Sequence, residues 1–121
     1  MEQVMITKTE NTIRACRQII SEFFAKHPNI PLQSDVERVL ELLLVNNIPM
    51  SGKPAGWAGG IIYAAANFRR IPCGIPGLLN HECEEFFHVS MDTIKRRAAK
   101  ITPLLEAVVS QAIVYCFQYG R

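Results

Sequence analysis

The sequence lacks the features that mark membrane and secreted proteins. No apolar run approaches the roughly 18 residues of a membrane-spanning helix, and the first ten residues contain no apolar signal core. Cysteine pairs of the C-x-x-C type are absent, and the four cysteines are widely spaced. We therefore expect a cytoplasmic protein in which Cys16 and Cys116, both on apolar helical stripes, are buried free thiols.

An excess of one charge sign and candidate β-strands are missing as well. The 13 Lys and Arg against 11 Asp and Glu leave a net charge of +2, so any basic function must come from a local cluster. No strand candidate is longer than four residues, and we find neither a repeat nor a low-complexity segment. The 121 residues, 49% of them hydrophobic, suffice for one core. We predict an all-α fold with an N-terminal tail (1–8) and a single helical domain (9–121).

Apolar residues spaced by three and four predict about six helices. The prolines at 28 and 31 should end the first helix, and Ser34 or Asp35 should cap the second, with Glu37 placed for a capping box. Thr102-Pro103 either kinks the fifth helix or starts a sixth. The expected helices are 9–27, about 34–46, about 53–68, about 80–87, 90–101 and 103–119.

The third of these helices should be the centre of the bundle. From Trp57 to Ala66 it carries apolar or aromatic side chains on every face, and a helix of this kind must be enclosed by others. Gly59 and Gly60 cost roughly 1 kcal/mol each against alanine in a helix interior. We therefore expect close approach of a neighbouring helix at Gly56, Ala58, Gly59 and Gly60. We predict that Trp57 belongs to the core.

The segment 84–100 has the pattern of a helix-turn-helix: a short helix, a turn at His88-Val89, a Ser90 cap and a basic second helix. If it binds DNA, Ser90 and the helix N-terminus hold a backbone phosphate. The residues expected to touch phosphates or base edges are Thr93, Lys95, Arg96, Arg97 and Lys100. The alternative is a solvated face, because nearby carboxylates would repel a phosphate backbone: Glu82, Glu84, Glu85 and Asp92.

Metal binding and catalysis have weaker support. Cys73, His81, Cys83 and His88 lie close in sequence, but their spacing matches no common zinc module. Acid–base pairs are available in one short segment, from His81, Glu82, Glu84, Glu85 and His88. No nucleophile, phosphate-binding loop or metal triad accompanies them. We predict neither a metal nor a cofactor, and we do not expect an enzyme.

The order of these elements resembles a cyclin-box repeat, and it looks closest to the core repeats of transcription factor IIB. There the central helix follows a Gly-Arg/Lys-x-Pro-like entry and reads Ala-Ala-Ala-x-Tyr-x-Ala. The residues that match here are Gly52, Lys53, Pro54, Ala58, Gly59, Gly60, Tyr63 and Ala64. The family's last two helices are matched by 84–87, Val89-Ser90 and 93–97. This match covers roughly 9–105, and the chain also resembles small prokaryotic domains built from one such repeat.

The resemblance implies a five-helix cyclin-like bundle with an added C-terminal helix, acting as a binding module in DNA- or transcription-related work. It implies that Lys95, Arg96, Arg97 and Lys100 contact the partner, with Ser90 and Thr93 positioning phosphates. The chain departs from the family in having one repeat rather than two and no zinc ribbon. An alternative is therefore a protein-interaction or oligomeric adaptor without nucleic acid, since cyclin boxes elsewhere bind proteins in an interhelical groove.

The last expected helix is more apolar than one domain needs. Its stripe consists of Leu104, Leu105, Val108, Val109, Ala112, Ile113 and Cys116, extended by Phe117 and Tyr119. Exposed apolar patches of this size usually mark interfaces, and two-fold homodimers are the commonest closed assembly. We predict self-association through this helix; the alternative is that it packs back on the first two helices.

Overall fold

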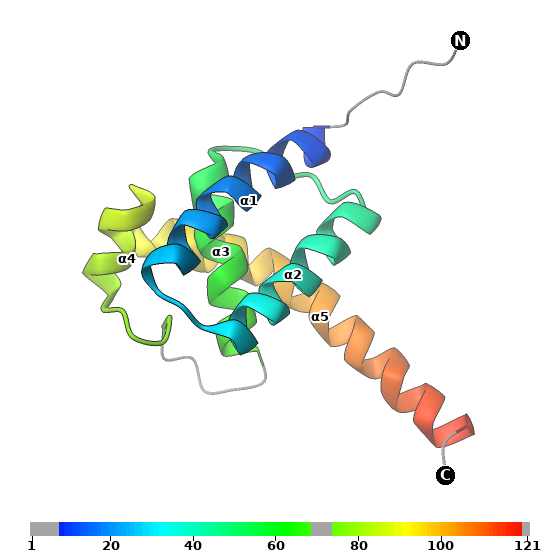
Figure 1. The fold of residues 1–121 in the computed structure, drawn as a ribbon. Helices are drawn as coiled ribbons and strands as arrows, with labels where there is room; N and C mark the ends of the chain where they lie inside the picture. Colours follow the sequence, from blue (N-terminus) through cyan, green and yellow to red (C-terminus); the bar gives the residue numbers. More distant parts are fainter. Residues whose placement is uncertain (1–7, 69–73, 120–121) are drawn as a thin grey trace.

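The computed structural model describes residues 8–68 and 74–119, with side chains described up to Ser110. This part of the chain contains no strand and five helices: α1 (Lys8–Lys26), α2 (Ile30–Val45), α3 (Pro54–Asn67), α4 (Asn80–Phe87) and α5 (Met91–Tyr119) (Figure 1). The predicted all-α class is confirmed. None of the described helices is long and apolar enough to cross a membrane. Of the predicted tail, only Lys8 is described, and α1 begins with it.

The central position of α3 is confirmed. Trp57, Ala58, Ile61 and Ile62 are 0% exposed, and α3 contacts each of the other four helices. In Figure 1, α3 lies between α1 and α2 on one side and α5 on the other. The absence of charge from this helix is therefore explained by its enclosure on all sides.

The glycines of α3 allow α5 to approach closely, as predicted. A Cβ added at Gly60 would lie 2.6 Å from Arg97 Cβ and 3.1 Å from the backbone nitrogen of Ala98. At Gly59 it would lie 2.9 Å from Cγ1 of Ile94. Because real Cβ atoms essentially never approach within 3.0 Å of a neighbour, glycine at both positions is a condition of this helix crossing.

Aromatic rings fix α4 against α1. The rings of Phe23 and Phe87 stack with centroids 5.7 Å apart and an interplanar angle of 18°. Phe86 meets Phe23 edge-on at 5.4 Å, and Lys26 lies over the Phe86 ring at 5.3 Å. Edge-on and stacked rings at these distances add to the burial energy, so this cluster holds α4 in the position from which the chain turns into α5.

The predicted start of α2 is wrong. The helix begins at Ile30, where Oδ1 of the Asn29 cap accepts a hydrogen bond from Leu32 N at 3.1 Å. Pro31 lies in the first turn, where its missing N–H is not required. Ser34 and Asp35 are therefore exposed helical residues rather than caps, and Glu37 forms an ion pair with Arg17 of α1.

The predicted sixth helix is not a separate element, because α5 continues through Pro103. Proline removes the hydrogen bond to the carbonyl four residues earlier, here that of Ala99. Both Ala99 and Pro103 are exposed, so this carbonyl lies on the solvent side, where water can satisfy it. Thr102 Oγ1 also donates to Ala98 O at 3.0 Å and supports the same turn. The described part of the chain is thus a five-helix bundle whose last helix is long.

Candidate functional site

The helices α4 and α5 are joined by a tight turn with ordinary cap chemistry. His88 adopts the left-handed conformation (φ 56°, ψ 36°), and its N–H donates to Glu84 O at 2.8 Å. Ser90 Oγ accepts from Thr93 N at 3.2 Å, as expected for an N-cap. The cap predicted at Ser90 is therefore present, and α5 starts immediately after it.

Two of the carboxylates beside the basic segment are bound to backbone N–H groups. Glu84 Oε2 accepts from Met91 N at 2.7 Å, at the N-terminus of α5. Glu82 Oε1 accepts from Leu79 N at 2.7 Å, at the N-terminus of α4. These bonds place negative charge where the helix dipole favours it. The backbone phosphate expected at Ser90 would therefore compete with Glu84 for the first turn of α5.

Lys95, Arg96 and Lys100 form the basic face of α5. All three side chains are exposed. At about 100° per residue, Arg96 and Lys100 lie opposite the buried stripe of Met91, Ile94, Ala98 and Ile101, and Lys95 lies beside that stripe. Arg96 Nη2 donates to Thr93 Oγ1 at 3.3 Å. Among the residues with described side chains, none of these three cations forms an ion pair. The basic face is consequently open to an anionic partner, with Asp92 as an exposed carboxylate of the same helix.

Arg97 occupies a different environment from the other basic residues of α5. Its Cζ lies 4.8 Å from the centroid of the Trp57 ring, and its Nη1 donates to Ser51 O. Nε1 of Trp57 donates to the same carbonyl at 2.8 Å. The guanidinium also lies against Gly52, whose φ of +95° strains any other residue. Arg97 therefore fastens α5 to the segment that enters α3.

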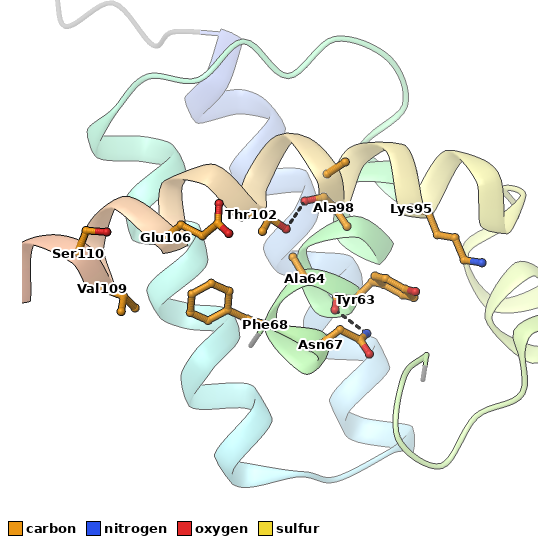
Figure 2. Close-up of a pocket in the computed structure, with 11 residues that line it drawn as sticks. Tyr63, Ala64, Asn67, Phe68, Lys95, Ala98, Thr102, Glu106, Val109 and Ser110 are labelled. Carbon is orange, nitrogen blue, oxygen red and sulfur yellow. Dashed lines mark hydrogen bonds between the residues drawn. The ribbon is translucent and has the colours of Figure 1, made fainter. Parts of the chain in front are cut away.

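A groove of about 780 Å³ runs between α3 and α5 (the α3–α5 groove, Figure 2). Figure 2 shows Lys95 toward one end and Glu106 and Ser110 toward the other. Asn67 Nδ2 donates to Tyr63 O and to Gly74 O, both at 2.9 Å. The lining residues are Tyr63, Ala64, Asn67, Phe68, Lys95, Ala98, Ala99, Thr102, Glu106, Val109 and Ser110.

A second groove, of about 550 Å³, lies between α2 and α5 (the α2–α5 groove). Its apolar lining includes Val45, which is 82% exposed, and Val108, which is 43% exposed. The remaining lining residues are Asp35, Arg38, Val39, Glu41, Leu42, Ala65, Phe68, Leu105 and Val109. Both grooves share Phe68 and Val109. The sequence pattern did not predict where either groove lies, because each groove is built from helices that are distant in sequence.

The cysteine and histidine residues form no site within the described part. No group of three or more His, Cys, Asp or Glu residues there is placed to hold a metal; Cys73 and the Cys116 side chain lie outside it. Burial raises the pKa of the Cys16 thiol to about 12. The pKa of Cys83 is also raised, by burial and then by the charges of Glu82 and Glu84. Both thiols stay protonated at neutral pH, so neither is an activated nucleophile.

Fold and site together define an all-α domain with one basic helix face and two interhelical grooves along α5. Comparisons of this chain with protein-family models, with curated proteins and with solved structures found no match.

Proposed function

We propose that this protein is a DNA-binding module of the single-repeat, cyclin-box-like kind, in which the basic face of α5 contacts the phosphates of a duplex. The observation that carries the proposal is the exposure of Lys95, Arg96 and Lys100 with no ion-pair partner among the described side chains. The bonds of Glu82 and Glu84 to helix N-termini support it, because these charges are already compensated in part within the chain.

The spacing of the three cations suits phosphate contact. Arg96 and Lys100, one turn apart on the same face, are about 6 Å apart along the helix axis at about 1.5 Å per residue. One DNA strand carries a phosphate about every 3.4 Å along the duplex axis, so this face can reach more than one of them. Arg97 is excluded from the contact set because its guanidinium is bound to Ser51 and Trp57. In this proposal Ser90 and Thr93 maintain the turn that orients the face.

The proposal is tested by measuring duplex affinity against salt. Binding of a short duplex, followed by fluorescence anisotropy, should weaken with a log–log slope of about −0.9 per neutralised phosphate, or about −2.7 for three contacts. In the Lys95→Ala/Arg96→Ala variant the slope should flatten to about −0.9. The matched control is Lys8→Ala/Arg14→Ala, which removes the same charge from exposed positions of α1 and should leave the slope unchanged. Absence of wild-type binding at about 50 mM salt would refute the DNA proposal.

A second candidate is an adaptor that binds protein rather than nucleic acid. The observation that favours it is the α2–α5 groove, where Val45 and Val108 are exposed beside Leu42 and Leu105. Apolar side chains gathered in an open groove commonly mark a protein interface. If the anisotropy experiment finds no duplex binding, this function becomes the leading one.

A further inference from the structure

The C-terminal end of α5 lacks charge and projects from the bundle. Residues 107–119 include no Asp, Glu, Lys or Arg, and Figure 1 shows the last turns of α5 extending beyond the other four helices. This segment (the α5 end) is about 20 Å long at 1.5 Å per residue. In proteins most helical stability comes from tertiary packing of an apolar face rather than from intrinsic propensity. A surface that covers the α5 end would therefore stabilise it.

The α2–α5 groove has the chemistry and length of such a surface. Its apolar wall is made by Val39, Leu42, Phe68 and Leu105. Its charged lining residues, Asp35, Arg38 and Glu41, are exposed on α2, so they can stay hydrated when the groove is filled. From Asp35 to Val45, α2 extends about 15 Å. An uncharged helix can lie against this apolar wall without burying an unpaired charge.

We propose that the protein forms a two-fold homodimer in which the α5 end of each copy lies in the α2–α5 groove of the other. The chain itself contains both halves of the contact, an uncharged projecting helix and an apolar groove of similar length. A two-fold axis makes such a contact twice and leaves no open surface for further growth. Val108 and Val109 belong to both halves, which places the axis near them. This inference does not rest on DNA binding, since the basic face lies on an earlier part of α5.

Two substitutions test the two halves of this contact separately, and a third serves as their control. Val45→Glu alters the groove at a residue that is 82% exposed, so folding should be preserved. Ile113→Glu alters the α5 end, since its spacing continues the stripe of Leu105 and Val109. Ile30→Glu is the matched control, because Ile30 is 80% exposed on the same helix as Val45 but does not line the groove. Circular dichroism melting curves check that each variant is folded.

Sedimentation equilibrium at tens of micromolar gives the result. The wild type and Ile30→Glu should have twice the 13.6 kDa chain mass, whereas Val45→Glu and Ile113→Glu should each raise Kd by about tenfold or more. An equimolar mixture of these two variants restores only one of the two contacts, because the other pairs a changed α5 end with a changed groove, so the mixture should not regain the wild-type Kd. A monomeric wild type would overturn the proposal. So would dimerisation lost in Ile113→Glu but unaffected by Val45→Glu, which indicates that the α5 ends pair with each other.

Discussion

At the scale of single residues, neighbouring cations on one helix differ in what their charge does. Lys95, Arg96 and Lys100 are exposed, as the position of the apolar stripe predicted. Arg97 directly follows Arg96 in the sequence, but its guanidinium contacts the Ser51 carbonyl, 46 residues away, and the Trp57 ring. Glu84 likewise binds the N–H of Met91. Helical periodicity gives the direction of a side chain, but it does not identify partners on other elements.

The structural role of Arg97 can be separated from its charge. Arg97→Lys keeps the charge but loses the planar group that stacks on Trp57 and donates to Ser51 O. We predict a loss of about 1–2 kcal/mol in the free energy of unfolding, measured by urea denaturation. The same substitution at Arg96, which is exposed, should change it by less than about 0.5 kcal/mol. Equal stability of the two variants would show that the contact with Trp57 contributes nothing.

At the scale of elements, local sequence patterns predicted most of the helices. They did not predict that Pro31 lies in the first turn of α2 or that α5 continues through Pro103. The bounds of α4 and the Ser90 cap follow from sequence patterns within a few residues of each end. From the local sequence Pro31 is expected to break a helix, but a first-turn position tolerates it. The continuation of α5 through Pro103 depends on the exposure of Ala99 and Pro103. Such exposure depends on tertiary packing, which the local sequence does not contain.

The crossing of α3 and α5 makes Gly60 less tolerant than Gly56. Gly60→Ala should lower the free energy of unfolding by about 1–3 kcal/mol through overpacking, although alanine favours a helix by about 1 kcal/mol. The reason is that the new Cβ would meet Arg97 Cβ at 2.6 Å and the Ala98 backbone at 3.1 Å. At Gly56 the nearest atom is a side-chain methyl group, Cγ2 of Thr93, at 3.1 Å. Gly56→Ala should therefore stay within about 1 kcal/mol of wild type; equal losses in thermal melts would contradict this account.

At the scale of the whole molecule, the sequence predicted a central helix and a basic face of α5. It did not predict the two interhelical grooves, the α3–α5 groove and the α2–α5 groove. Burial of Trp57 and the close approach at Gly60 followed from residue types in a single segment. The two grooves depend on how α2, α3 and α5 cross, and both depend on Phe68 and Val109. No short stretch of sequence contains that information. The apolar stripe of the last helix predicts an interface, and the structure adds an apolar groove between α2 and α5 that such a helix could occupy.

The two proposals together predict how salt dependence changes with assembly. A dimer presents two basic faces, each with Lys95, Arg96 and Lys100. If both reach one longer duplex, twice as many phosphates are neutralised, and the slope should steepen from about −2.7 to about −5.4. Val45→Glu, which leaves each basic face intact, should show about half the wild-type slope on the same duplex, and Ile30→Glu should match wild type. Equal slopes for Val45→Glu and wild type would mean that only one chain of the dimer contacts the duplex at a time.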